Sequence, residues 1–138
     1  VSFIYTCPIT GLKKRSRFDF LRFDNRAVDV KTTKSCEVDS FSKDAVNMGY
    51  GIQEMFYRES YFVLTGLDLD DFIFVASEYA TMDDCETFYI GDEDYDRLFV
   101  IYEETMTELL VSLKDNVWHG HSVTDKRKKI NKPRYCEW

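Results

Sequence analysis

The alternation of apolar and polar residues in the first quarter of the chain predicts short strands. Apolar side chains at every second position are typical of a strand with one buried face. The predicted strands cover residues 2–7, 14–23 and 26–31. Turn-like residues at 8–11 and Asp24–Asn25 separate them. Because a tight turn joins two antiparallel strands, we expect the three strands to form an antiparallel meander.

The spacing of apolar residues changes after residue 37 and predicts a long helix over 38–58. Side chains close to a 3.6-residue period form its apolar face: Val38, Phe41, Ala45, Met48, Ile52, Met55 and Phe56. Asp39 and Ser40 are its candidate N-caps. Gly49 and Gly51 each weaken such a helix by about 1 kcal/mol relative to Ala. We therefore expect a reason for small residues at these two positions.

The second half of the chain predicts two more strands and a second long helix. The strands cover 72–78 and 86–90, and the helix covers 92–114. Acidic residues open that helix, where the positive end of its dipole favours them. The remaining tail is irregular and basic. The order of elements, β-β-β-α-β-β-α, predicts a mixed α/β domain.

Composition and length narrow the class of protein. With 138 residues, 44% of them hydrophobic, the chain is long enough for one domain with a real core. It begins with Val, so we expect a piece of a longer protein. No apolar run approaches the roughly 18 residues of a membrane span, and the N-terminus lacks the apolar core of a signal peptide. The four cysteines are scattered without a CxxC pair, which argues against a zinc knuckle or iron–sulfur cluster and favours reduced thiols in a cytoplasm.

The charge of −7 is unevenly distributed along the chain. Residues 1–58 hold ten Lys/Arg and seven Asp/Glu, residues 59–125 hold two and seventeen, and residues 126–138 hold six and one. Such asymmetry is found where a nucleic-acid-binding face sits on an acidic body. A solvated acidic surface with a basic tail gives the same distribution, so charge alone leaves both interpretations open.

Two aspartates and a lysine stand in the predicted strands. Asp29 and Lys31 share one strand face, because side chains at i and i+2 point the same way. With the turn at residues 24–25, Asp19 lies almost opposite Asp29. Two carboxylates about 5 Å apart repel each other unless a proton or a cation joins them.

A Mg²⁺ ion suits this pair, because it binds through one or two carboxylates, with water and substrate phosphate completing its shell. Lys31 would then hold a water or steady a phosphate. The alternative is a half-exposed hairpin on which Lys31 is an ordinary salt-bridge partner, and the pattern alone does not decide between them.

The predicted helix adds Gln53 and Tyr57, which share a face at i and i+4, with Tyr50 one turn before Gln53. The combined motifs are R-x-D, D-x-K-T-T and G-Y-x-x-Q-x-x-x-Y. Together they resemble the PD-(D/E)XK nuclease superfamily, in particular its RecE/RecB-like and lambda-exonuclease-like branch. The resemblance runs from about Thr10 to Trp138, where Trp118, Gly120 and Pro133 are similar to the closing segment of RecE-like exonucleases.

This resemblance implies a restriction-endonuclease-like core, a central mixed β-sheet flanked by helices. Residues 1–138 would form a single nuclease domain with a basic tail over 119–138. The family fold opens with a helix that supplies an acidic metal ligand; we expect this helix to lie on a removed segment or on another chain, or the site to be depleted.

The resemblance also implies roles for individual residues. Asp19, Asp29 and the Val30 backbone carbonyl would bind the metal, and Lys31 would orient the attacking water. Gln53 and Tyr57 would position the DNA end or the catalytic residues, with Tyr50 in support, and Arg17 would touch a phosphate. Arg17 is equally well explained as a salt-bridge partner.

The implied activity is that of a Mg²⁺-dependent exodeoxyribonuclease, with Mn²⁺ as a substitute, acting on the ends of linear duplex DNA in recombination and repair. A ring-like homo-oligomer, a single-strand annealing partner and the cytoplasm of a bacterial or phage-infected cell are further implications. The alternative is a non-catalytic DNA-binding or assembly module that keeps the fold.

Three further groups of residues after position 58 have sequence patterns that are less specific for a function. Lys126, Arg127 and Lys128 in the basic tail would grip the DNA backbone or serve only to keep the chain soluble. His119 and His121 lack a third ligand and indicate ordinary loop histidines. The acidic run at 68–71 lacks the glycine and distal glutamate of a calcium loop and indicates a solvated turn.

Overall fold

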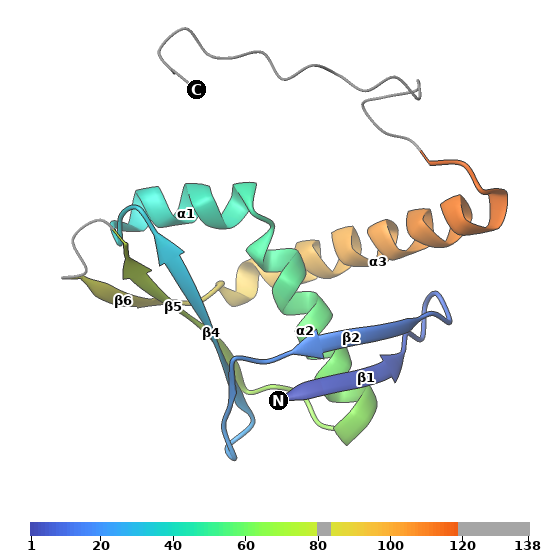
Figure 1. Cartoon of the computed structure of the whole chain (residues 1–138), viewed down its shortest axis with the longest axis horizontal. Helices are drawn as coiled ribbons and strands as arrows, with labels where there is room; N and C mark the ends of the chain where they lie inside the picture. Colours follow the sequence, from blue (N-terminus) through green and yellow to red (C-terminus); the bar gives the residue numbers. More distant parts are fainter. Residues whose placement is uncertain (80–83, 119–138) are drawn as a thin grey trace, which may run out of the picture.

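The computed structural model describes residues 1–79 and 84–118, which form two sheets and three helices (Figure 1). The predicted basic tail, including Lys126, Arg127, Lys128 and both histidines, lies outside the described residues. The elements in chain order are β1 (Ser2–Thr6), β2 (Lys13–Arg17), β3 (Phe20–Leu21), β4 (Arg26–Thr33), α1 (Val38–Asn47), α2 (Tyr50–Thr65), β5 (Asp71–Glu78), β6 (Cys85–Phe88) and α3 (Asp92–Asp115).

The main sheet is mixed and has the order β3-β4-β5-β6. Its central pair, β4 and β5, is parallel, with Asp29 opposite Phe74, and the two outer pairs are antiparallel. Alternate residues of the central pair are buried, among them Ala27 and Asp29 on β4 and Phe72 on β5. The α/β prediction is confirmed, and the buried face of this sheet carries the predicted aspartate and lysine on β4.

The predicted meander is wrong, because the strand expected over 14–23 is two strands in two different sheets. β1 and β2 form a separate antiparallel hairpin, and β3 joins the main sheet. The break comes at Phe18, which is 2% exposed and packs edge-on against Phe3 and Tyr57. Beyond this point burial no longer follows the apolar alternation, since Phe20 is 60% exposed. The chain bends so that Phe18 can enter the core.

The predicted single helix over 38–58 is also wrong, because α1 and α2 are separate helices. Gly49 lies between them with φ of 70°, a left-handed conformation that glycine adopts without strain. Gly51 allows a close approach of α3, since a Cβ there would lie 2.7 Å from Leu98 Cδ2. The N-cap of α1 is Glu37, so Asp39 and Ser40 lie inside its first turn.

The second predicted helix is confirmed as α3, with Asp92, Glu93 and Asp94 in its first turn. Tyr102 and Met106 bury one side of it against Met55 on α2. Within residues 1–79 and 84–118, no helix is both long and apolar enough to cross a membrane.

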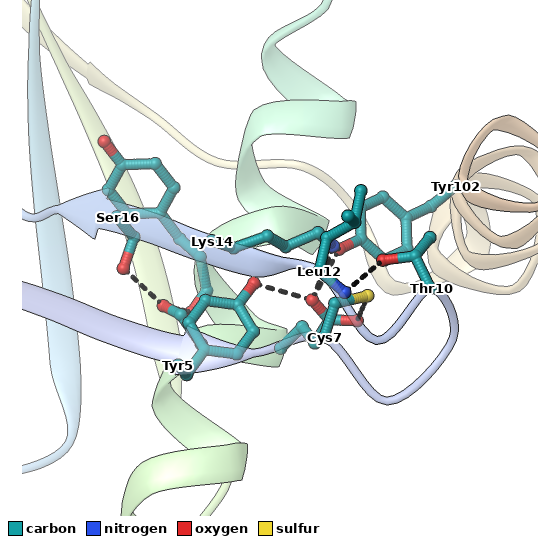
Figure 2. A network of polar contacts seen from close by, with 10 residues as sticks. Tyr5, Cys7, Thr10, Leu12, Lys14, Ser16 and Tyr102 are labelled. Atoms are coloured by element: carbon teal, nitrogen blue, oxygen red, sulfur yellow. Dashed lines mark hydrogen bonds and ion pairs between the residues drawn. The ribbon is translucent and has the colours of Figure 1, made fainter. Parts of the chain in front are cut away.

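A buried polar network fixes the β1–β2 hairpin on the two long helices (Figure 2). Lys14 Nζ lies 2.8 Å from Glu59 Oε2 and donates a 2.7 Å hydrogen bond to the Tyr102 hydroxyl. The hydroxyls of Tyr5 and Tyr102 both donate to the same Glu59 oxygen, at 2.6 and 2.8 Å. Because Lys14 and Glu59 are nearly buried, each charge depends on the other for compensation.

We predict that Lys14→Met lowers the free energy of unfolding by about 3–5 kcal/mol, because it leaves the Glu59 carboxylate buried without its cation. Chemical denaturation monitored by circular dichroism measures this loss. The double variant Lys14→Met/Glu59→Gln should lose less than Lys14→Met alone, since no buried charge remains. A double variant as unstable as the sum of the two single variants would contradict the account.

The Lys14–Glu59 pair also makes the stability of the fold depend on pH. Burial raises the pKa of Glu59, but hydrogen bonds from Lys14, Tyr5 and Tyr102 outweigh it, and the net pKa lies below its ordinary value. The stability that Glu59 contributes is therefore present at neutral pH and lost as pH falls through its folded-state pKa. The difference in stability between Lys14→Met and the wild type should shrink on acidification; a difference that stays constant from neutral to acidic pH would contradict this.

Candidate active site

Asp29, Lys31 and Gln53 form a closed set of contacts between β4 and α2. Lys31 Nζ lies 2.7 Å from Asp29 Oδ2 and donates a 2.6 Å hydrogen bond to Gln53 Oε1. The amide nitrogen of Gln53 donates a 2.8 Å hydrogen bond to Asp29 Oδ1. The side chain of Gln53 therefore holds both charged groups at once. The sequence prediction that these three residues share a site is consistent with this geometry.

The set is partly shielded from water. Asp29 is 5% exposed, while the Lys31 side chain is 16% exposed. Asp29 Oδ2 is buried and accepts no directed hydrogen bond, so its only compensation among the described residues is the charge of Lys31. A buried carboxylate oxygen with a free lone pair can bind a cation without first giving up a hydrogen bond.

The aromatic ring of Tyr50 packs against the ammonium group of Lys31. The ammonium lies 4.2 Å from the centre of the Tyr50 ring, a distance typical of a cation–π contact. The Tyr50 ring in turn stacks on Phe74 and tilts against Phe41, with ring centres 5.6 and 5.9 Å away. Since both phenylalanines are buried, Tyr50 connects Lys31 to the hydrophobic core.

Asp19 lies at the bend just before β3, at the same level of the sheet as Asp29. Phe20 pairs with Val28, so the next position along the register places Asp19 opposite Asp29. Asp19 is exposed, and its Oδ2 accepts a 2.9 Å hydrogen bond from the Val30 backbone N–H. Because the N–H and C=O of one strand residue face the same neighbour, the Val30 carbonyl is directed toward the Asp19 edge.

Arg17 and Tyr57 are joined to each other rather than to the Asp29 set. The Tyr57 hydroxyl donates a 2.8 Å hydrogen bond to the Arg17 backbone carbonyl, and its ring packs on Phe18 and Phe72. The Arg17 side chain is exposed, and no ion pair described within 1–79 and 84–118 involves it. Tyr57 thus holds the end of β2 in place, next to Asp19.

The donor set suits a hard divalent cation with an incomplete protein shell. The described part of the chain contains no group of three His, Cys, Asp or Glu side chains that could bind a metal. Two carboxylates and a backbone carbonyl nevertheless match Mg²⁺, which keeps several waters and shares substrate phosphates. The observation in favour of this fit is the buried Asp29 Oδ2, whose one partner among the described residues is the Lys31 ammonium.

Sequence reasoning missed a second buried carboxylate beside Gln53. Glu54 is fully buried and accepts hydrogen bonds at Oε1 from Arg58 Nε and the Tyr95 hydroxyl, at 2.8 and 2.7 Å. Burial raises its pKa above the ordinary value, and the hydrogen bonds from Tyr95 and Arg58 offset only part of this. The i, i+4 spacing of Glu54 and Arg58 was the available signal. The cluster anchors α2 to α3 rather than facing Lys31.

A cavity of about 510 Å³ lies beside this site and not in it. Apolar side chains of α1, α2, β6 and α3 line it, including Phe41, Ile52, Phe88 and Leu98. It shares Phe41 and Phe74 with the platform under Tyr50 but includes neither Asp29 nor Lys31. The catalytic candidates therefore do not depend on it.

Residues 2–137 match the model of a family described as a PDDEXK-like domain of unknown function, DUF3799. The chain belongs to this PDDEXK-like family. The predicted resemblance to the PD-(D/E)XK nuclease superfamily is thereby confirmed. No curated protein matches the chain.

A solved structure resembles the fold of this PDDEXK-like domain. It is a crystal structure of a "putative exonuclease" from Eubacterium rectale, with a TM-score of 0.68 and 18% sequence identity. The match covers 96% of this chain and 53% of that chain, so the domain spans about half the length of the solved protein. The likeness confirms the restriction-endonuclease-like fold expected from the sequence.

We predict that Gln53→Ala lowers the free energy of unfolding of the PDDEXK-like domain by about 1–3 kcal/mol, because buried Asp29 Oδ1 loses its donor. The matched control is Asn47→Ala, which removes an exposed amide from α1 and should change stability by less than about 0.5 kcal/mol. Urea titration of both variants measures the difference. Equal stability of the two variants would mean that Gln53 does not hold the site together.

Proposed function

We propose that the chain is a divalent-metal-dependent nuclease domain that hydrolyses phosphodiester bonds in DNA. The observation that carries the proposal is the contact of Gln53 with both Asp29 and Lys31, together with the hydrogen bond of the neighbouring Val30 N–H to Asp19. Membership of a PDDEXK-like family supports the same chemistry.

The residues of the site have separate roles in this proposal. Asp19, Asp29 and the Val30 carbonyl would hold Mg²⁺, for which Mn²⁺ can substitute, at the edge where Val30 N–H meets Asp19. The bound ion supplies Lewis-acid stabilisation of the attacking and leaving oxygens. Lys31 holds the attacking water by hydrogen bonding, because its ammonium is a compact donor of three protons. Gln53 and Tyr50 keep that ammonium in one position.

The finer form of the proposal is an exonuclease that degrades linear duplex DNA from its ends during recombination or repair in a bacterial or phage-infected cytoplasm. The printed description of the Eubacterium rectale protein and the resemblance to RecE-like enzymes support it. A homo-oligomer that encloses DNA and a protein that anneals single strands belong to the same proposal. Arg17 would contact a phosphate beside Asp19, and the tail residues Lys126, Arg127 and Lys128 would bind the DNA backbone.

A second candidate function is a non-catalytic module that binds DNA or assembles with other proteins. The observation in its favour is that the described residues contain no group of three His, Cys, Asp or Glu side chains that could bind a metal. The intact contacts of Asp29, Lys31 and Gln53 argue for the nuclease, because a pure binding module has no need of a buried carboxylate–ammonium pair held by an amide.

The nuclease proposal predicts loss of linear duplex DNA in the presence of Mg²⁺ and none in EDTA. End-labelled linear duplex, closed circular duplex and single-stranded DNA are incubated with the protein in parallel. Lys31→Ala should lower the rate by about 100-fold or more, because it removes the group that positions the water. Lys34→Ala is the matched control, since Lys34 is an exposed lysine just after β4 and should keep the wild-type rate.

Cleavage of circular as well as linear duplex DNA would exclude an exonuclease that requires DNA ends, but it would still support the proposal of a nuclease. Absence of cleavage by a protein that still binds DNA would support the non-catalytic module. Equal rates for Lys31→Ala and Lys34→Ala would exclude the assigned role of Lys31.

A further inference from the structure

Three basic side chains stand in a row on the outer face of β2. Lys13, Arg15 and Arg17 are all exposed, whereas Lys14 and Ser16 between them are buried. Because successive side chains of a strand point to opposite faces, the three bases share one face and stand about 6.6–6.8 Å apart. We call Lys13, Arg15 and Arg17 the basic row.

The surroundings of the basic row leave its charge uncompensated. Its direct partners across the hairpin are Thr6, Ile4 and Ser2, which carry no charge. Residues 1–18 contain no Asp or Glu, although the whole chain has 25 of them. None of the ion pairs described within 1–79 and 84–118 includes a member of the row. A concentrated positive surface on an otherwise acidic protein attracts polyanions.

The buried side of the same strand fixes which residues face outward. Lys14 is bound to Glu59 and Tyr102, and Ser16 donates a 2.7 Å hydrogen bond to Ser60 (Figure 2). A one-residue slip of the hairpin would bring Arg15 inward and break all of these bonds. The network inside the hairpin therefore holds the basic row in one orientation.

The row ends beside the candidate active site. β2 runs from the hairpin loop toward the main sheet (Figure 1), and Asp19 follows Arg17 by two residues. The Tyr57 hydroxyl holds the Arg17 carbonyl, so the end of the row is anchored to α2. From Lys13 to Arg17 the row spans about 13 Å. One DNA strand advances about 3.4 Å per phosphate along the helix axis, so the row can face several consecutive phosphates.

We propose that the basic row binds the phosphate backbone of DNA and leads a strand toward Asp19. This inference rests on the proposed nuclease function, of which it names the substrate-binding surface. Exposed charges on a two-stranded hairpin also discourage edge-to-edge aggregation, and that role requires no DNA.

The test measures DNA affinity by fluorescence anisotropy with a labelled duplex oligonucleotide in EDTA, where no cleavage occurs, at several NaCl concentrations. The variant is Lys13→Ala/Arg15→Ala, which leaves Arg17 and the metal ligands intact. The matched control is Lys43→Ala/Lys114→Ala, which removes the same charge from exposed positions on α1 and α3. Denaturation curves and gel filtration accompany both.

We expect the slope of log affinity against log salt to fall by about 1.8 in the basic-row variant, because two phosphate contacts with duplex DNA are lost. Binding at moderate salt should weaken about tenfold or more. The control should keep most of the wild-type slope. With Mg²⁺, the basic-row variant should show a raised KM for DNA and an unchanged kcat. This is the pattern expected when the lost contacts bind the substrate and the transition state equally.

Equal DNA affinity and slope in the two variants would overturn the basic row as a DNA-binding surface, whether or not the wild type cleaves DNA. Aggregation of the basic-row variant at unchanged DNA affinity would also overturn it and favour edge protection. If the wild type binds through the row but no metal supports cleavage, the nuclease proposal fails and the DNA-binding surface stands.

Discussion

The contact of Gln53 with both Asp29 and Lys31 is the constraint on which the arrangement of this domain depends. It joins the first turn of α2 to the centre of β4, across the boundary between helix and sheet. Gln53 can reach β4 because Gly49 ends α1 and lets α2 start in a new direction. Gly51 then allows α3 to approach the same turn. Two glycines that weaken a continuous helix are thus the residues that permit the site to form.

The burial of Asp29 beside Lys31 is difficult to explain by stability alone. Removing two charges from water carries a large desolvation penalty, and well-packed apolar residues often replace such a pair without loss. Here Asp29 Oδ2 has only the Lys31 ammonium as a partner among the described residues, and that ammonium packs against the Tyr50 ring. By contrast, Glu59 is saturated by Lys14 and two tyrosines, as expected of a group whose role is structural. Glu54 Oε2 is also buried without a hydrogen-bond partner, so the Asp29 set differs from the framework in its position next to Asp19 rather than in the unsatisfied oxygen alone.

Local patterns in the sequence predicted the structural features that depend on local spacing. They missed the features that depend on contacts between residues far apart in the chain. The strand periodicity of 26–31 and the turn at residues 24–25 predicted the pairing that places Phe20 opposite Val28, because register follows from turn position. The bend at Phe18 was not predictable, since the alternation continues through it and only the core explains why Phe18 turns inward. In the Lys14–Glu59–Tyr102 network, Glu59 lies 45 positions and Tyr102 lies 88 positions after Lys14 in the sequence, so no local pattern contains the network. The PDDEXK-like family was predicted because its motifs are short and lie on adjacent elements.

If Asp19 and Asp29 act together on one divalent cation, Mn²⁺ binding reveals it without reference to cleavage. Electron paramagnetic resonance titration counts free Mn²⁺ in the presence of the wild type, Asp29→Asn, Asp19→Asn and the control Asp39→Asn, whose carboxylate is exposed on α1. We expect saturable binding by the wild type and the control, and loss of that binding in both site variants. Binding of Mn²⁺ that is unchanged in Asp29→Asn, or absent from the correctly folded wild type, would contradict it.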